Sequence, residues 1–350
     1  MSVNDESAAG GKGTQRRHRR NTGAMTLRQV AQLADVAPVT VSRVLNTPDV
    51  VSPEVRERVL AVIRETGYVP NRLAGGLAST RSNLIAAIVP TITMSVFLQT
   101  VQSLTDTLFD ADYQLMLGQT GYSPEREDAL LEAIIGRRPD GIVLTGVDHS
   151  AQSRQRLLGA GIPVVETWDL TDHPIDMLVG FSHRDIGSSV ARYLAGRGRQ
   201  QLALVTADDE RARRRASAFE ATALELGLPP VQRISVGGSR TLSSGRTALA
   251  RLAESGSRPD AVFCSSDLLA LGVMTEAQSR ELRVGQDLGV VGFGDFDFVA
   301  DLEPALTSVR INGAAIGEQA ARFLVARAEG HAVAQPVVDV GFSIVERASA

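Results

Sequence analysis

The sequence of 350 residues predicts a small all-α domain followed by a larger α/β core of two lobes. Three observations lead to this prediction. Residues 25–67 contain three short segments with apolar residues at helical spacing. From residue 82 onward, short apolar runs alternate with amphipathic stretches, which is typical of parallel sheets built from βαβ units. The chain is 43% apolar and long enough for two or three domains of about 100 to 200 residues.

The composition excludes several classes of protein. No run of about 18 apolar residues occurs, and residues 1–23 are polar and basic without an apolar segment of the signal-peptide type. We therefore expect a cytoplasmic protein with no membrane partner. The single cysteine, Cys264, has no partner for an internal disulfide, and the five histidines lack the spacing of a zinc or haem site. We expect neither a metal ion nor another cofactor.

The charge of the chain is unevenly distributed. Residues 1–80 contain eleven Lys and Arg against seven Asp and Glu, or +4, whereas the whole chain carries −4. A basic N-terminal region indicates a polyanionic partner. Residues 1–24 lack apolar periodicity and include the run Arg16–Arg20, so we predict a disordered basic tail. The tail is either a phosphate-contacting arm or a solvated leader, and we favour the leader because short basic runs are common.

Residues 25–70 predict a helix-turn-helix domain. Thr26 and Gln29 fit a capping box at the start of a first helix that ends near Ala34. After a tight turn at residues 35–37, Pro38 suits the first position of a second helix. Two helices joined by so short a turn form the motif whose second helix enters the DNA major groove.

A third helix is expected between an N-capping Ser52 and a terminating Gly67. The presumed exposed face of the second helix carries short polar groups and one arginine, which are side chains that read base edges. An ordinary small helical bundle is the alternative interpretation. The residues that we predict to contact DNA in this domain are Thr26, Leu27, Pro38, Val39, Thr40, Ser42, Arg43 and Asn46.

Three sequence blocks resemble the DNA-binding headpiece and hinge of the lactose-repressor (LacI) family of bacterial transcription regulators. The blocks are Thr40-Val-Ser-Arg-Val-Leu-Asn46, Gly67-Tyr-Val-Pro-Asn-Arg-Leu73 and Leu77-Ala-Ser79. The resemblance implies that residues 71–81 form a hinge helix on the operator, paired with that of the dimer mate, and that Leu77 enters the minor groove. The hinge residues implied to contact DNA are Asn71, Arg72, Leu77 and Ala78.

The sequence departs from the family pattern at two places. Gly75 and Gly76 lie in the middle of the hinge, where each glycine costs roughly 1 kcal/mol relative to alanine in a helix. Ala37 stands where an N-capping Ser or Thr is usual, so the second helix lacks a side-chain cap.

Residues 82–346 predict a core of two Rossmann-like lobes with a ligand in the cleft between them, as in the sugar-binding periplasmic proteins. The family resemblance implies the same periplasmic-binding-protein-like core. The predicted strands are Leu84–Val89, Gln114–Leu117, Gly141–Leu144, Ile162–Val165, Gln201–Val205, Ala261–Cys264 and Gly289–Phe293. The helical stretches between them include Pro124–Arg137, Asp185–Ala195 and Asp267–Ser279.

The core shows no signature of an enzyme. It has no dinucleotide-binding glycine motif between a strand and a helix, no Walker sequence, no nucleophile elbow and no paired-histidine metal motif. Cys264 lies inside an apolar run, where burial makes a thiol inert. Two alternatives are a transported-solute binding protein, which would carry a signal peptide in place of the headpiece, and a sugar-acid enzyme, which would need catalytic residues.

Loops at the carboxyl ends of the strands are expected to line the cleft. Trp168 either stacks on a polyhydroxylated ligand or belongs to the core. Arg215 matches the arginine that commonly grips the effector in this family, and we expect the neighbouring Arg211, Arg213 and Arg214 on the surface. Asp267 either accepts ligand hydrogen bonds or caps its helix. The predicted effector contacts are Thr93, Phe97, Trp168, Arg215, Asp267 and Asp295.

Further motifs resemble the core of the repressors of bacterial gluconate uptake and metabolism within this family. They include Gly121-Tyr-Ser-Pro-Glu125, Ala160-Gly-Ile-Pro-Val-Val-Glu166, Val179-Gly-Phe181 and Val340-Gly-Phe-Ser343. The resemblance implies a homodimer on a near-palindromic operator, released when gluconate or a related sugar acid pairs with Arg215. Neutral sugars, nucleosides and purines bind other relatives, and co-repression would reverse the sign of the response.

Overall fold

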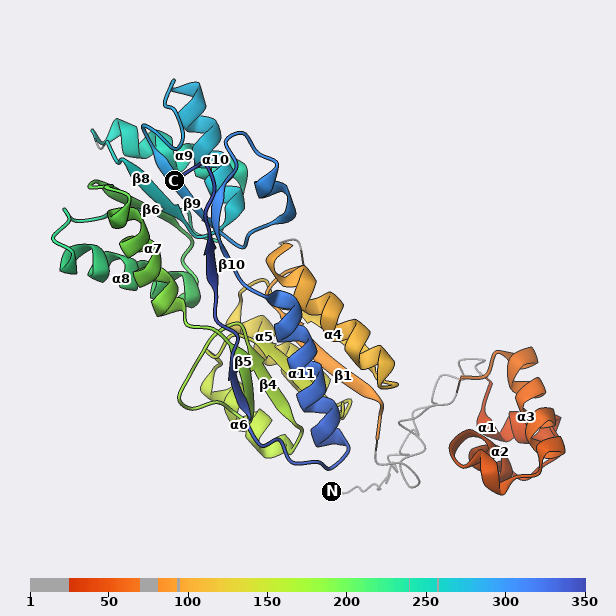
Figure 1. The fold of residues 1–350 in the computed structure, drawn as a ribbon. Helices are drawn as coiled ribbons and strands as arrows, with labels where there is room; N and C mark the ends of the chain where they lie inside the picture. The colour runs from red at the N-terminus through yellow and green to blue at the C-terminus, as the bar shows by residue number, and fades with distance from the viewer. Residues whose placement is uncertain (1–24, 70–80, 93–94, 239, 257) are drawn as a thin grey trace, which may run out of the picture. The chain divides into compact units, whose positions relative to one another are not determined.

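The structure is a computed structural model, and it describes residues 25–69, 81–92, 95–238, 240–256 and 258–350 (Figure 1). The predicted basic tail of residues 1–24 lies outside the described residues, as does the predicted hinge up to residue 80. The chain divides into two compact units at the boundary between residues 80 and 81, and each unit is described by itself.

The first unit contains the three helices that the sequence predicts. They are α1 (Leu27–Leu33), α2 (Pro38–Asn46) and α3 (Pro53–Thr66), with a short 3-10 helix η1 (Pro48–Val50) that the sequence did not indicate. Val30, Val41 and Val59 are completely buried at the centre of this unit. Each helix contributes one of these valines, so the three amphipathic faces meet in one small core.

The ends of these helices agree with the sequence in all but one respect. The capping box is present, because Thr26 N–H donates to Gln29 Oε1 at 2.8 Å and Gln29 N–H donates to Thr26 Oγ1 at 3.3 Å. Ala37 is the N-cap of α2 and provides no side-chain bond. Ser52 is the N-cap of α3, but its side chain accepts no capping bond, so the predicted cap is wrong in that respect. Gly67 ends α3 in the left-handed region with φ of 61°.

The second unit is built on two six-stranded sheets. The first sheet has the order β11-β5-β4-β3-β1-β2, and its strands are β1 (Leu84–Val89), β2 (Gln114–Gln119), β3 (Gly141–Thr145), β4 (Val164–Thr167), β5 (Met177–Gly180) and β11 (Val337–Asp339). The second has the order β12-β10-β9-β8-β6-β7, and its strands are β6 (Leu202–Thr206), β7 (Gln232–Ser235), β8 (Ala261–Cys264), β9 (Gly289–Phe293), β10 (Thr307–Arg310) and β12 (Ser343–Val345). All the pairings given for these strands are parallel except that of β10 with β12, which confirms the predicted α/β lobes.

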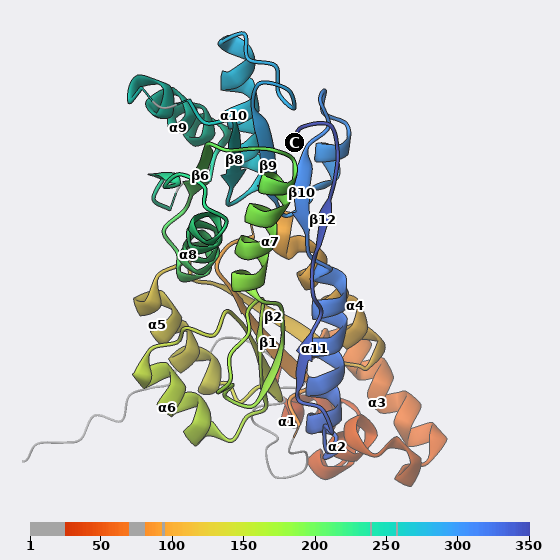
Figure 2. The ribbon, with the colours of Figure 1, turned by 60° about the vertical axis from the view of Figure 1, so that its left-hand side comes forward.

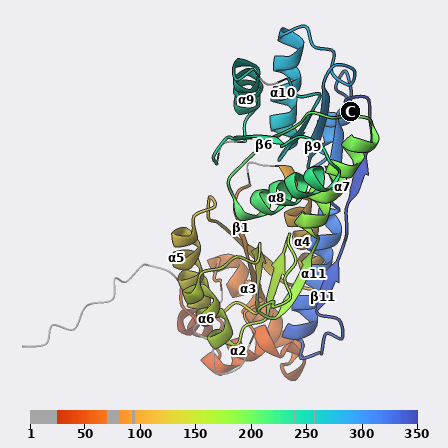
Figure 3. The same cartoon turned by 90° about the vertical axis from the view of Figure 1, so that its left-hand side faces the viewer.

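Helices cover both faces of each sheet (Figures 2 and 3). In the first lobe, α5 (Pro124–Ile135) and α6 (Ala151–Ala160) lie on one face, and α4 (Leu98–Asp110) and α11 (Gly313–Ala328) lie on the other. Side chains of β1 point to opposite faces of the sheet. Ile85 packs in the core beneath α4 and α11, and Ile88 packs in the core beneath α5 and α6.

The second lobe has the same layered arrangement. Its helices are α7 (His183–Gly196), α8 (Glu210–Glu225), α9 (Leu242–Glu254) and α10 (Asp267–Ser279). Each lobe also has a short 3-10 helix, η2 (Ser95–Phe97) in the first lobe and η3 (Asp297–Ala300) in the second. The pairs α7 with α8 and α9 with α10 pack closely against each other. In the part of the chain that the structure describes, no helix has both the length and the apolar character needed to cross a membrane.

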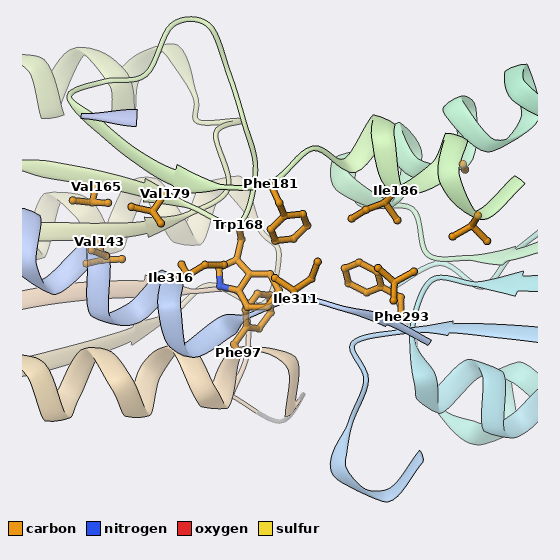
Figure 4. Packing of buried hydrophobic residues seen from close by; sticks show 14 of the residues in the cluster. Phe97, Val143, Val165, Trp168, Val179, Phe181, Ile186, Phe293, Ile311 and Ile316 are labelled. Atoms are coloured by element: carbon orange, nitrogen blue, oxygen red, sulfur yellow. The ribbon is translucent and has the colours of Figure 1, made fainter. Parts of the chain in front are cut away.

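The chain passes between the lobes three times, after β5, after β10 and after β11. One apolar cluster continues across these crossings from one lobe into the other. Figure 4 shows Phe181 and Ile311, which lie on two of the crossings, between Trp168 of the first lobe and Phe293 of the second. The lobes therefore share one apolar core at the crossings, and Trp168 and Phe293 of this core also border the candidate site.

Candidate functional site

A cavity with about 410 Å³ of empty space, part of it open to solvent, lies where loops of the two lobes meet. It forms beyond the carboxyl ends of the strands, which is the position that the sequence predicts. The first lobe contributes Val96, Phe97, Tyr122 and Trp168. The second lobe contributes His183, Asp209, Arg211, Arg215, Arg240, Ser265, Ser266, Phe293 and Phe296.

Arg215 lies on α8 and lines this cavity, where the sequence predicts it. The backbone of α8 is held close to α7 by Gly187, because a Cβ at that position would lie 2.2 Å from the Arg215 carbonyl oxygen. The guanidinium carbon lies 4.1 Å from the centre of the Phe293 ring. Burial lowers the pKa of Arg215 to about 10, so the side chain stays cationic at neutral pH.

His183 is a cavity residue that the sequence did not reveal. Its ring is buried, with Nδ1 2.8 Å from Arg215 Nη1 and Nε2 2.9 Å from the carbonyl oxygen of Trp168. Because an arginine only donates and a carbonyl only accepts, Nδ1 must accept and Nε2 must carry the proton. Burial, reinforced by the charge of Arg215, keeps the pKa of His183 well below its usual value of 6.5. The imidazole is therefore neutral. The sequence did not reveal its contact with Arg215, because a single histidine at the start of a helix carries no recognisable pattern.

Two further arginines line the cavity, which corrects part of the sequence prediction. Arg211 was expected on the surface, but its side chain is only 11% exposed and borders the cavity. Positions four apart on a helix share a face, so Arg211 and Arg215 point to the same side of α8. Arg240, from the loop after β7, pairs with Asp209 and lies with its guanidinium carbon 4.5 Å from the centre of the Tyr122 ring in the other lobe. Arg213 is exposed, as expected.

Arg214 also departs from the surface position that the sequence predicts. It pairs with Asp148 and with the buried Asp169, both of the first lobe. It therefore forms ion pairs across the two lobes beside the cavity. The prediction failed because a run of arginines gives no information about which carboxylates the other lobe presents to it.

The two aromatic residues predicted at the site have both cavity and core contacts. Trp168 borders the cavity, yet it is buried, and its Nε1–H donates to Thr100 Oγ1 at 3.1 Å. Phe97 packs edge-to-face against it with ring centres 4.9 Å apart. The predicted contact Thr93 lies outside the described residues.

Asp267 and Asp295 do not line the cavity, contrary to the sequence prediction. Asp267 is buried, and its carboxylate accepts from Ser308 Oγ–H at 2.6 Å and from the Phe296 N–H at 2.9 Å. It does not cap α10 either, because Ser266 is the N-cap. Asp295 is held by ion pairs with Arg310 and Arg347. Both carboxylates thus turn toward the ends of the second sheet, where protein groups already satisfy them.

The cavity opens beside a second hollow that is richer in carboxylates. The two share Tyr122, Asp209 and Arg211, and the second is also lined by Glu127, Asp148 and Glu210. Among the residues that the structure describes, no group of three or more His, Cys, Asp or Glu side chains is arranged to hold a metal ion.

In the helical unit, α2 presents the surface that the sequence assigns to DNA. Pro38, Val39, Arg43 and Asn46 are exposed, and Thr40 and Ser42 are half-buried. Asn46 Nδ2–H donates to the carbonyl oxygen of Ser42 at 2.9 Å, which fixes this side chain against its own helix. At α1, Thr26 is exposed within its capping box and Leu27 packs against the small core. The hinge residues Asn71, Arg72, Leu77 and Ala78 lie outside the described residues.

The chain matches two known protein families. Residues 26–71 match the bacterial regulatory proteins of the lacI family, and residues 191–350 match a periplasmic binding protein-like domain. The chain is 32% identical to the HTH-type transcriptional regulator GntR of Escherichia coli (strain K12) over 319 residues, which are 91% of this chain and 96% of that relative. It is also 32% identical to the regulator of the same name from Pseudomonas aeruginosa over 332 residues, 94% of this chain and 97% of the relative.

Solved structures agree with these matches. The crystal structure of a LacI-family transcriptional regulator from Silicibacter pomeroyi has a TM-score of 0.87 and 32% identity, covering 93% of this chain and 99% of that one. The lac repressor dimer bound to operator and the anti-inducer ONPF has a TM-score of 0.78 and 26% identity, covering 93% and 99%. The chain therefore belongs to the LacI family, as a DNA-binding transcriptional repressor with a two-lobed ligand-binding core rather than an enzyme.

Proposed function

We propose that this repressor is controlled by a sugar acid, gluconate or a close relative, whose carboxylate pairs with Arg215 in the cavity. The observation that carries the proposal is the charge of the cavity. Its described lining contains three arginines but a single carboxylate, that of Asp209. A carboxylate loses its hydration on entering such a cavity, and a cationic partner compensates for this loss. The effector should therefore be an anion rather than a neutral sugar.

The relatives support the same class of effector. Two of them carry the name GntR, and the sequence motifs resemble those of gluconate repressors. The aromatic rings of Phe97, Trp168 and Phe293 border the cavity and suit the C–H faces of a polyhydroxylated chain. We propose that binding of the effector shifts the angle between the lobes and releases DNA, to the extent that it binds the two lobe arrangements with different affinity.

We further propose that residues 25–70 form the DNA-binding headpiece, with α2 in the major groove and the hinge residues 71–81 in the minor groove. In this proposal, residues 1–24 are a basic tail and residues 82–346 are the core for effector binding and dimerisation. A homodimer on a near-palindromic operator, in the cytoplasm, fits this assignment. Exposed apolar side chains on the neighbouring α4 and β2, namely Leu98, Phe109 and Leu117, offer a surface for a second copy.

Calorimetric titration of the intact protein tests the effector. We expect gluconate or 2-ketogluconate to bind and to release an operator that the protein has selected from random-sequence DNA, and we expect glucose and ribose to do neither. If glucose and gluconate gave equal responses, the carboxylate would not be recognised. The sugar-acid assignment would then fall, while the assignment as a repressor would stand on its family.

A further inference from the structure

We propose that the effector carries an anionic group at each end of a polyhydroxylated chain, as an aldarate or a phosphorylated aldonate does. One anionic group would pair with Arg215 and the other with Arg211 and Arg240. This inference rests on the proposed function and narrows it, because gluconate itself has only one charged group.

The first argument is the balance of charge in the cavity. Arg211, Arg215 and Arg240 contribute three positive charges, and Asp209 contributes one negative charge. His183 contributes none, because its Nδ1 accepts from Arg215 and its ring is neutral. The described lining therefore has a net charge of +2. A ligand with one carboxylate leaves half of this excess unmatched.

The second argument is that Asp209 is already fully engaged. It pairs directly with Arg240, its carboxylate lies 3.8 Å from Arg211 Nε, and it caps α8 by accepting from the Ala212 N–H at 3.3 Å. Among the described residues, Arg215 forms no ion pair with a carboxylate, and its buried Nε has no hydrogen-bond partner. One carboxylate thus serves two arginines, and the third faces the cavity with a donor unused.

The third argument is that solvent and neighbouring acids do little to offset the excess. Arg240 is 8% exposed and Arg215 is 5% exposed, so water screens their charges weakly. Asp169 is taken by Arg214, and neither Asp267 nor Asp295 lines the cavity. The missing negative charge must therefore come from the ligand.

The lining of the second hollow makes it an unfavourable place for an anionic group, so we place both anionic groups of the ligand in the cavity that Arg215 lines. Among the described residues, its lining includes the carboxylates of Glu127, Asp148 and Glu210 in addition to Asp209, with Arg211 as the one arginine. A phosphate or second carboxylate placed there would meet mostly like charge. Both ends of the ligand should therefore lie near the three arginines, with the hydroxylated chain against the aromatic rings.

The test compares six-carbon ligands of increasing charge by calorimetry in phosphate-free buffer: glucose, gluconate, glucarate and 6-phosphogluconate. We expect glucarate, 6-phosphogluconate or both to bind about tenfold or more tightly than gluconate, since the added anionic group meets a positive charge that no protein carboxylate balances. The comparison of glucarate with 6-phosphogluconate also distinguishes a second carboxylate from a phosphate, which carries a charge of about −1.5 to −2 at neutral pH. If both bound no more tightly than gluconate, the inference would be overturned and the proposed function would remain.

Variants connect the preference to the named arginines. Arg240→Gln and Arg211→Gln should each reduce the preference for the ligand with two anionic groups over gluconate. Arg240→Lys should retain most of this preference because the positive charge is kept. Arg213→Gln, an exposed arginine on the same helix, should leave the preference unchanged. Operator binding at wild-type affinity shows that each variant is folded. An unchanged preference in both Arg240→Gln and Arg211→Gln would overturn the inference, whereas equal binding of glucose and gluconate would remove the proposed effector class as well.

Discussion

At the scale of single residues, the neutral side chain of His183 orients the guanidinium of Arg215 in the cavity. His183 accepts from one nitrogen of Arg215 and donates to the backbone of Trp168, so it connects the second lobe to the first through one imidazole ring. A protonated ring would repel the guanidinium and lose the bond at Nδ1. The low pKa of His183 therefore keeps Arg215 oriented throughout the physiological range of pH.

Arg215→Ala should abolish the release of operator by the sugar acid and leave operator affinity nearly unchanged, because the substitution lies in the effector core and not in the helical unit. Arg215→Lys should restore the response only in part, since an ammonium lacks the planar two-pronged donor. The measurement is operator binding with and without gluconate or glucarate. Arg213→Ala is the matched control on the same helix, and a wild-type response in Arg215→Ala would remove this residue from the site.

Asp267 should give the core a measurable pH dependence. Burial raises the pKa of its carboxyl to about 6, from an ordinary value of 3.8. The folded protein then holds this proton more firmly than the unfolded chain does, so the contribution of Asp267 to stability declines as the pH rises from about 4 to about 6. Asp267→Asn should flatten the urea-unfolding stability over this range relative to the wild type. A slope that is unchanged in the variant would contradict the assignment.

Asp267→Ala is the companion substitution. It leaves the Phe296 N–H and the Ser308 hydroxyl without their acceptor, and a buried donor left unpaired costs about 1–3 kcal/mol. The asparagine amide retains a partner for each, because its oxygen accepts from Phe296 and its nitrogen donates to Ser308 Oγ. We expect alanine to lower the denaturation midpoint more than asparagine does, both measured at pH 7.

At the scale of elements, α2, the helix that we propose for the major groove, has no side-chain cap. Ala37 has the extended backbone of an N-cap, with φ of −71° and ψ of 149°, but no oxygen to offer the first turn. Ala37→Ser should supply it and stabilise the helix by about 0.5–2 kcal/mol. Hydrogen exchange of the α2 amides in the intact protein should slow accordingly. Exchange at the wild-type rate would mean that the added hydroxyl does not cap this helix.

Arg43, exposed on the same helix, is the residue we expect to read a base edge or an adjacent phosphate. Arg43→Ala should weaken operator binding by about 1–3 kcal/mol if it reads a base, and the loss should change when the base at its position is changed. A uniform loss across operator sequences would indicate a phosphate contact instead. Retention of full affinity would exclude Arg43 from the interface.

Sequence patterns predicted elements best where burial gives a continuous apolar run. The strands Leu84–Val89, Ala261–Cys264 and Gly289–Phe293 lie where they were predicted, and so does the helix Asp267–Ser279. The edge strands β2 and β7 contain only exposed and half-buried residues, and β7 was not predicted at all. The strands β5, β10, β11 and β12 were also missed, although β5 is completely buried. Each has only three or four residues, and a run this short stands out in the sequence only where turn residues and a helical stretch flank it, as they do at β8.

The candidate site was less predictable than the fold for a physical reason. Arg215 and Phe97 were predicted by resemblance and position, and both line the cavity. Arg240 was not, because its role depends on an ion pair with Asp209 that joins separate segments of the second lobe. Asp267 was misassigned because a polar residue at a strand end does not reveal whether protein groups already satisfy it. Contacts made across loops and lobes carry no local sequence signal.

At the scale of the whole core, Arg214 couples the two lobes through Asp148 and the buried Asp169. We expect Arg214→Ala and Asp169→Asn each to destabilise the core, and the double variant to lose less than the sum of the two, because the second change removes a contact already lost. A double-mutant cycle in urea unfolding measures this coupling. Additive losses would show that the pair contributes nothing of its own, and Arg213→Ala again serves as the control.

The three crossings between the lobes affect how this protein folds during its synthesis on the ribosome. The open edge of β5 has no partner until Val337–Asp339 emerges, and the face of α4 stays bare until α11 follows. In the second lobe, β10 likewise awaits Ser343–Val345. Multidomain chains usually fold one domain at a time from the N-terminus during synthesis. Here neither lobe completes its sheet until almost all of the core has been translated. The apolar edge of β5 therefore stays exposed from the synthesis of Gly180 until that of Val337, and the two lobes complete their folding together.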